Sequence, residues 1–185
     1  MPGPFEREVK LRFESAEAAR VAVMATGATP VHGRRLQDDS LLDTTAEELR
    51  GRRSALRVRV DGGRSLLTFK GPVQPARVKV REELETVVGD GHLLLHIFEE
   101  LGFRVWFRYQ KYREEFSLDD CTVAIDETPV GVFVEIEGGE AGIDRVALRL
   151  GRGPADYVLE SYRGLFVQYC GQRGLPARDM LFDAD

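Results

Sequence analysis

The sequence predicts an α+β protein built on an eight-stranded antiparallel β-barrel, a tunnel with helices packed on its outside. Three observations predict this fold: period-two alternation, short turns between the alternating segments, and amphipathic helices. About eight segments alternate, and the short turns that join most of them favour antiparallel pairing. So many antiparallel strands favour a closed barrel, because closure removes exposed sheet edges. Amphipathic helices interrupt the strands and need an apolar sheet face for their stripes, so the charged face of the strands must line the interior.

The first strand, expected at 5–13, already shows the pattern. Alternation places Glu6, Glu8 and Lys10 on one face and Val9 and Leu11 on the other. Moving an unpaired charge from water into an apolar core costs roughly several kcal/mol, so this face is not an ordinary core face. The same alternation returns in five more strands.

The first half of the chain alternates strands with short helical segments. Ser15 is expected to cap a helix over 16–26, and Gly27 is expected to end it. The further elements expected are an extended run at 29–43, a polar connection with one helical turn at 45–53, strands at 55–60 and 66–70 around the turn Asp61-Gly62-Gly63, and a strand at 76–88.

The second half follows the same plan. A helix over 91–101 is expected to bury an apolar stripe of Leu94, Leu95, Phe98 and Leu101. The other elements expected are strands at 103–116, 121–126 and 132–137, helices at 141–150 and 159–172, and a polar, loose tail at 175–185. We therefore expect a single tunnel domain over residues 1–174.

Composition narrows the partners. The 185 residues carry 26 basic and 31 acidic side chains, a net charge of −5, which argues against nucleic acid as a partner. Cys121 and Cys170 have no metal-ligand spacing, and no apolar run reaches about 18 residues. We expect a soluble, cytoplasmic protein with no membrane partner and reduced thiols; a homodimer is compatible with the sequence, which does not fix the oligomeric state.

Acids and bases are equally numerous on the charged face. The acids are Glu6, Glu8, Glu83, Glu85, Asp126, Glu135 and Glu137, and the bases are Lys10, Arg57, Arg59, Lys70, Arg81, Lys111 and Arg113. One such strand is usually a solvated sheet face. Six of them in hairpin order, in a chain whose helices need the other face, indicate a charged, wet interior.

The chemistry of these side chains suggests the ligand. Arginine forks suit phosphate oxygens, and a chain of three phosphates carries a charge of about −4 near neutral pH. Carboxylates among those cations would repel the phosphates unless a divalent metal ion binds between the carboxylates and the phosphates. The pairs Glu6/Glu8 and Glu135/Glu137 offer the hard oxygen ligands that Mg²⁺ or Mn²⁺ prefers.

The segment Glu6-Arg7-Glu8-Val9-Lys10 matches the ExExK signature of the CYTH superfamily, the triphosphate tunnel metalloenzymes. The signature alone is weak, but further segments resemble the family in order from residue 5 to residue 165. These are Leu41-Leu42-Asp43-Thr44, Leu56-Arg57-Val58-Arg59, Thr68-Phe69-Lys70-Gly71-Pro72, Arg81-Glu82-Glu83-Leu84-Glu85, Lys111-Tyr112-Arg113, Asp126, Phe133-Val134-Glu135-Ile136-Glu137 and Ser161-Tyr162-Arg163-Gly164-Leu165.

The resemblance implies metal-dependent chemistry on a small-molecule triphosphate. It implies phosphate binding by Arg57, Arg59, Lys70, Arg81, Lys111 and Arg113, and Mg²⁺ or Mn²⁺ binding by Glu6, Glu8, Asp126, Glu135 and Glu137. Lys10, Glu83 and Glu85 are implied as catalytic residues that position phosphate, help to activate the nucleophile, orient the bases or join the metal shell.

Three functions stay open from the sequence. The first choice is hydrolysis of tripolyphosphate, thiamine triphosphate or a nucleoside triphosphate, because the pair Arg57/Arg59 resembles the phosphohydrolase members. The second is an adenylyl cyclase, because Ser161-Tyr162 resembles the branch named for class IV adenylyl cyclases. The third is a non-catalytic binder, which would require a broken set of charged residues.

A few residues are expected outside the site. Lys79 shares the charged face but is assigned to solvent at a strand end, and Tyr162 is assigned to helix packing. Arg104 and Arg108 have the opposite parity from Lys111 and Arg113, so they are expected on the outer face unless a β-bulge intervenes, and Trp106 is expected there as well.

Overall fold

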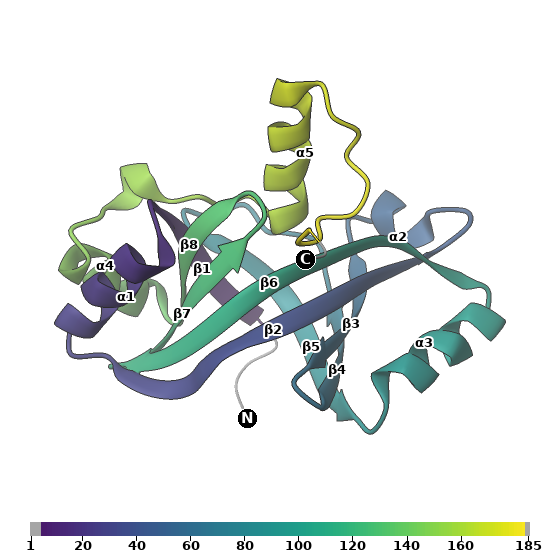
Figure 1. Cartoon of the computed structure of the whole chain (residues 1–185), viewed down its shortest axis with the longest axis horizontal. Coiled ribbons are helices and arrows are strands. Elements are labelled where there is room, and N and C mark those ends of the chain that lie inside the picture. The colour runs from purple at the N-terminus through teal and green to yellow at the C-terminus, as the bar shows by residue number, and fades with distance from the viewer. Residues whose placement is uncertain (1–4, 184–185) are drawn as a thin grey trace.

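The computed structural model, which describes residues 5–183, is a closed antiparallel barrel in the order β1-β5-β4-β3-β2-β6-β7-β8 (Figure 1). The predicted fold class is confirmed. The strands are β1 (Phe5–Phe13), β2 (Thr29–Thr44), β3 (Ala55–Asp61), β4 (Arg64–Lys70), β5 (Lys79–Val88), β6 (Phe103–Leu118), β7 (Cys121–Thr128) and β8 (Gly131–Glu137). Within the described residues the α-helices are α1 (Ala16–Ala25), α2 (Glu48–Gly51), α3 (Gly91–Glu100), α4 (Glu140–Arg149) and α5 (Tyr162–Arg173).

Most element boundaries agree with the sequence to within one or two residues. Two starts differ by three residues. β5 begins at Lys79 and not at residue 76, and α5 begins at Tyr162 and not at residue 159. The later start of α5 follows from its cap, because the Ser161 hydroxyl accepts a hydrogen bond from the Gly164 amide at 3.1 Å.

β1 closes the barrel by pairing on both of its edges. Its first half pairs with β5, where Glu6 lies opposite Arg81, and its second half pairs with β8. There Glu8 lies opposite Glu137 and Lys10 opposite Glu135. The register therefore brings charges from distant parts of the chain onto one inner surface.

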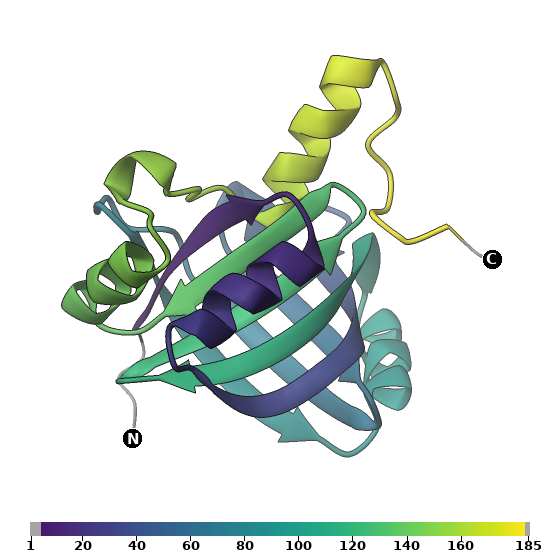
Figure 2. The ribbon, with the colours of Figure 1, turned by 60° about the vertical axis from the view of Figure 1, so that its left-hand side comes forward.

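The main hydrophobic core lies outside the barrel wall. α1 and α4 cover β1, β7 and β8, and Figure 2 shows α1 lying across these strands. Val9 and Leu11 are fully buried there, against apolar residues such as Ile136 and Ile143. The outer face of the wall is thus apolar beneath α1 and α4, and the charged parity of β1 and β8 faces inward, as the sequence predicts.

A second apolar cluster fills one end of the barrel, which we call the α5 end. Phe107, Tyr109 and Phe133 line it from the strands, and Tyr162 and Phe166 reach it from α5, which stands on that end of the barrel (Figure 1). Sequence alone left open whether this helix covers a mouth of the tunnel. In the structure it does, through packing of aromatic rings such as Phe133 and Tyr162, whose centroids are 5.6 Å apart.

The expectation of a loose tail is wrong for the residues that the structure describes. Met180 is fully buried, its amide donates to the Arg108 carbonyl at 2.9 Å, and its carbonyl accepts from the Gln110 amide at 2.9 Å. The Asp179 carboxylate accepts the Arg108 amide at 2.7 Å. The tail thereby pairs with the part of β6 that β7 does not reach.

The predicted stripe of α3 is wrong at one position. Leu94, Leu95 and Phe98 are half-buried, whereas Leu101 is 67% exposed. Leu101 follows the last turn of a short helix, where the chain already turns toward β6. Among the described helices, none has the length and apolar character needed to cross a bilayer.

Replacing Met180 by Ala should destabilise the fold by about 2–5 kcal/mol, because it removes a fully buried side chain and leaves a cavity against β6. Urea unfolding measures this. The matched control is Leu175→Ala, since Leu175 lies in the same segment and is half exposed. Equal stabilities of the two variants would mean that the tail does not pack on β6 in solution.

Candidate functional site

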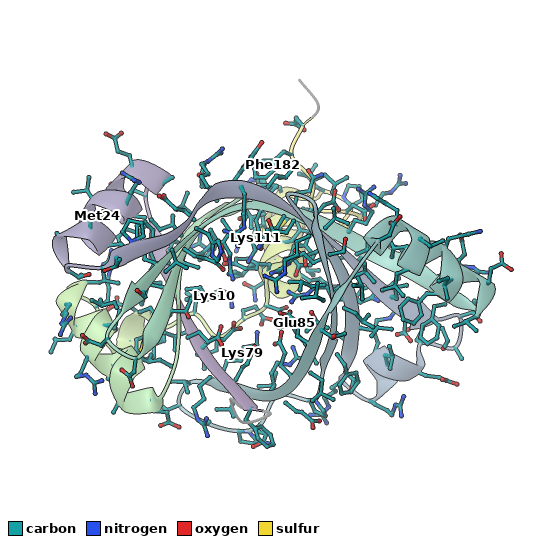
Figure 3. The ribbon with its side chains drawn as sticks, turned by 90° about the horizontal axis from the view of Figure 1, so that it is seen from below. Lys10, Met24, Lys79, Glu85, Lys111 and Phe182 are labelled. Carbon is teal, nitrogen blue, oxygen red and sulfur yellow. The ribbon has the colours of Figure 1, made fainter. Side chains whose placement is uncertain are left out.

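Charged side chains from all the strands gather inside the barrel. Figure 3 looks into this interior, and Lys10, Lys79, Glu85 and Lys111 lie around it. Acids and bases are again equally numerous. The bases are Lys10, Arg57, Arg59, Lys70, Lys79, Arg81, Lys111 and Arg113, and the acids are Glu6, Glu8, Asp39, Glu83, Glu85, Asp126, Glu135 and Glu137. All fourteen residues predicted from the sequence are on this surface, and Asp39 and Lys79 join them.

The first basic pair is Arg57 and Arg59 on β3, which share an inward face. Both are buried, and fully buried Asp39 on β2 lies between them. Its Oδ1 accepts from Arg59 Nε at 2.9 Å and lies 3.3 Å from Arg57 Nε. Although burial alone would raise it, the charges of Arg59 and Arg57 hold the pKa of Asp39 below its usual value. Asp39 is therefore ionised, hydrogen-bonded to Arg59 and in ion-pair contact with Arg57.

The second basic pair is Lys111 and Arg113 on β6, held by Asp126 on β7. Asp126 accepts from Lys111 Nζ at 2.9 Å and from Arg113 Nε and Nη2 at 2.7 and 2.6 Å. The Tyr162 hydroxyl donates to the same carboxylate at 2.5 Å. Burial and the neighbouring Arg113 lower the pKa of Lys111 to about 8. Four donors therefore converge on one fully buried aspartate.

Lys10 joins the acids of β1 and β8. Its ammonium donates to Glu8 Oε1 at 3.1 Å and lies 3.3 Å from Glu135 Oε2. Burial alone would lower its pKa, but the charges of Glu8 and Glu135 hold the pKa of Lys10 above the usual value. Lys10 is a cation at neutral pH, so it contributes charge and hydrogen bonds and does not accept a proton.

Lys79 is a correction to the sequence analysis, which assigned it to solvent. The residue is only 9% exposed, and its ammonium donates to Glu8 Oε1 at 2.5 Å. β5 begins at Lys79, and its first residues pair with β1, so this strand end lies inside the closed wall and not at an open rim.

Lys70, Glu83 and Glu85 form a neighbouring group on β4 and β5. The Lys70 ammonium pairs with Glu83, which also hydrogen-bonds to Glu6. Arg57 Nη2 donates to Thr68 Oγ1 at 3.0 Å, and that hydroxyl donates to Glu85 Oε2 at 2.8 Å. The two glutamates thus orient interior cations, one of the roles that the resemblance implied for them.

Arg81 is the least committed of the predicted phosphate-binding residues. Its Nε and Nη2 donate to the Gly71 carbonyl at 3.0 and 2.6 Å, beside the strand end at Lys70. Burial lowers the pKa of Arg81. Its guanidinium lies at the edge of the charged surface and holds the loop after β4.

The acidic patch, defined here as Glu6, Glu8, Glu135 and Glu137, crowds four carboxyl groups together, and the ionisation of two of them is opposed. Burial and the charges of Glu135 and Glu8 raise the pKa of Glu137 to about 7, and burial with the hydrogen bond to Glu83 raises the pKa of Glu6 to about 9. Within residues 5–183 no three acidic, histidine or cysteine side chains already form a metal cage. The patch nevertheless fits Mg²⁺ or Mn²⁺, which takes one or two carboxylates and completes its shell with water and phosphate oxygens.

Sequence reasoning missed or underestimated three contacts. Asp39 could have been found from the alternation, because it lies two residues after Gln37 on the inward face of its strand. Tyr162 packs as expected and also reaches Asp126, with Lys10 and Lys111 over its ring at 5.1 and 5.0 Å. Asp43 caps α2 by accepting the Leu49 and Arg50 amides, both at 3.0 Å. Its resemblance to a family motif therefore has a structural basis.

Arg108 is found on the outer face as expected, where it pairs with Asp38 at 2.9 Å. The pairing of β2 with β6 has a register shift between Leu41 and Leu42, so parity does not assign a face to Arg104. Arg104 is exposed and donates to the Glu99 and Phe103 carbonyls. Trp106 packs beneath α5, with Arg50 and Arg163 over its ring.

A closed antiparallel barrel with an interior of paired acids and bases defines the class of tunnel-type barrel proteins. The chain belongs to the CYTH domain family, whose model matches residues 4–147. A protein named "Putative adenylate cyclase" from Methanocaldococcus jannaschii is 31% identical over 105 residues. That match covers 56% of this chain and 60% of the relative, so the chain aligns with only part of it.

Solved structures share the fold. An X-ray structure named as a "putative adenylate cyclase" from Vibrio parahaemolyticus has a TM-score of 0.77 at 21% identity, and covers 89% of this chain and 99% of that one. A Hippeastrum protein named "Putative adenylyl cyclase", for which a dominant triphosphatase activity is described, has a TM-score of 0.57 at 19% identity. That match covers 92% of this chain and 89% of the Hippeastrum chain. At these identities the likeness shows the fold alone.

The raised pKa of Glu137 predicts a pH-dependent cost in the metal-free protein. Glu137 has a pKa of about 7 when folded and an ordinary value near 4.5, so between these the folded state holds more protons and its stability falls as pH rises. Replacing Glu137 by Gln should therefore stabilise the metal-free protein at pH 8 by about 1–3 kcal/mol, with little change at pH 4.

Urea unfolding in the presence of chelator at the two pH values measures this difference. A Glu137→Gln variant that is no more stable than the parent protein at pH 8 would contradict the charge crowding of the acidic patch.

Proposed function

We propose that this protein catalyses metal-dependent hydrolysis of a small triphosphate bound inside the barrel. The observation that carries the proposal is the juxtaposition of two basic pairs, each held by an aspartate, with an acidic patch in which the ionisation of Glu6 and Glu137 is opposed. The basic pairs match a polyphosphate chain, and the patch matches a divalent cation that the phosphates also bind. The substrate classes are inorganic tripolyphosphate, thiamine triphosphate and nucleoside triphosphates.

Phosphate binding is assigned to Arg57, Arg59, Lys111 and Arg113, with Lys70 and Lys10 nearby. Carboxylates already fix the Nε groups of Arg59 and Arg113. Guanidiniums that are oriented before the substrate arrives lose little side-chain entropy on binding, and two nitrogens of a fork suit two phosphate oxygens. Arg81 remains a predicted phosphate ligand, although its present contacts hold the Gly71 carbonyl.

Metal binding is assigned to the acidic patch, with Glu137 as its central member. A bound Mg²⁺ or Mn²⁺ would neutralise the developing charge on the phosphates. Asp126 was expected as a ligand, and that expectation stays a prediction. Its contacts with Lys111, Arg113 and Tyr162 support another role, which is to orient the second basic pair.

The reaction requires little covalent chemistry from the protein. A water oxygen forms a bond to the terminal phosphorus, the bond to the bridging oxygen breaks, and diphosphate leaves when the substrate is tripolyphosphate. Rate enhancement in phosphoryl transfer comes mainly from in-line positioning and neutralisation of charge. Protonated Lys10, between Glu8 and Glu135, is placed to stabilise that charge beside the acidic patch.

Adenylyl cyclase activity is the second candidate, supported by the names of the Methanocaldococcus and Vibrio relatives. In that reaction the ribose 3′-hydroxyl attacks the α-phosphorus and pyrophosphate leaves. A cyclase must also seat an adenine base. The aromatic residues of the interior, Phe107, Tyr109, Phe133 and Tyr162, are already packed at the α5 end, which supports a substrate with less need for a stacking surface. A non-catalytic binder is the third candidate, and the complete charged set argues against it.

Product analysis separates these reactions. Tripolyphosphate, thiamine triphosphate and ATP are each incubated with the protein and Mg²⁺ or Mn²⁺, and ³¹P NMR follows the products. We expect orthophosphate, with release stopped by chelator. Pyrophosphate with cyclic AMP from ATP would establish the cyclase instead, and metal-dependent binding without turnover would establish a binder.

The acidic patch can be tested by one substitution and a control. Glu137→Gln should lower metal-stimulated turnover by a factor of about 100 or more, because it removes a carboxylate that would bind the metal. The variant should nevertheless be at least as stable as the parent protein. Glu127→Gln removes the same charge from the outer face of β7, where Glu127 pairs with Arg34, and should retain activity. Full activity of Glu137→Gln would exclude the metal assignment.

A further inference from the structure

One structural unit occurs twice inside the barrel. In each copy, two cations separated by one residue share the inward face of a strand: Arg57 and Arg59 on β3, and Lys111 and Arg113 on β6. In each copy, a fully buried aspartate on the neighbouring strand stands directly opposite the second cation of the pair. The register pairs Asp39 with Arg59 and Asp126 with Arg113.

The two copies share one atomic contact, the hydrogen bond from the Nε group of the second cation to the aspartate. Asp126 receives Arg113 Nε at 2.7 Å, and Asp39 receives Arg59 Nε at 2.9 Å. Asp39 Oδ1 also lies 3.3 Å from Arg57 Nε, so one oxygen serves both arginines of the pair. Within residues 5–183 Arg59 makes no hydrogen bond through its Nη nitrogens, which leaves them available to a ligand.

Electrostatics alone would argue against an acid at this position. A buried carboxylate repels a polyanion that binds the arginines beside it, so an acid that served only as a charge would weaken substrate binding. The carboxylate also lies between two like charges on one strand face, and it fixes the Arg59 Nε group by a hydrogen bond and draws the Arg57 Nε group to 3.3 Å by charge. These two effects on substrate affinity have opposite signs, so they can be distinguished.

We propose that Asp39 is a positioning residue that aims the Arg57/Arg59 pair at the substrate phosphates. This inference rests on the proposed function, because it requires that the pair binds the phosphates of the substrate. Asp39 contacts the arginines and not the substrate, so its effect is on affinity through their orientation.

Two variants with the same charge test the proposal. Asp39→Asn keeps the acceptor oxygen and removes the charge, whereas Asp39→Ala removes both. If Asp39 positions the arginines, Asp39→Ala should bind tripolyphosphate about tenfold more weakly than Asp39→Asn, a difference of about 1.4 kcal/mol, and its KM should rise by a similar factor. Isothermal titration with tripolyphosphate and steady-state kinetics measure the two quantities.

The control is Asp38→Ala, which removes an acid from the outer face of the same strand, where Asp38 pairs with Arg108 and Gln110. It should bind tripolyphosphate like the parent protein. Equal affinities of Asp39→Ala and Asp39→Asn, or tighter binding by Asp39→Ala than by Asp39→Asn, would overturn the positioning role. A parent protein that does not bind tripolyphosphate would instead overturn the proposed function.

A measurement on the parent protein covers the case in which Asp39→Ala does not fold. In ¹⁵N NMR, the Arg59 Nε–H should exchange slowly with solvent, and it should stay protected when tripolyphosphate is added. The exposed Arg53 provides the reference for fast exchange. An Arg59 Nε–H that exchanges as fast as that of Arg53 in the bound state would contradict the proposal.

Discussion

Pairing of charge inside a closed wall is the constraint on which the structure depends. Removing an ion from water costs roughly several kcal/mol of free energy unless a partner of opposite charge and further hydrogen bonds replace the lost hydration. The barrel meets this requirement by register: Asp39 meets Arg59, Asp126 meets Arg113, and Glu135 meets Lys10 across neighbouring strands. The wall can carry this interior because the outer face of β1, β7 and β8 forms an apolar core with α1 and α4.

The acidic patch is the place where pairing is incomplete. Glu8 and Glu137 face each other across β1 and β8, and the pKa of Glu137 is raised because burial and two acidic neighbours oppose its ionisation. Such crowding opposes folding in the absence of a cation and favours a cation when one is present. Functional sites often lower the stability of the unliganded protein in this way, and binding of the ligand restores the stability.

The two ends of the barrel differ. α5 and the tail occupy one end, with Tyr162 reaching Asp126 from the helix and Met180 pairing with β6. Because Tyr162 contacts the aspartate that holds Lys111 and Arg113, the covering helix is tied to the basic pair that we assign to phosphate. The helix is therefore part of the site as well as part of the core.

Period-two alternation was enough to predict the fold class and most of the charged interior, because it assigns each strand residue to a face without knowledge of its partners. Which charges meet depends on how the strands and helices pack in three dimensions. Asp39, Lys79 and the hydroxyl of Tyr162 enter the site through strand register and helix docking, which join residues far apart in the chain. The packing of Met180 was hidden for the same reason, since its partner strand lies about 70 residues earlier, at Tyr109.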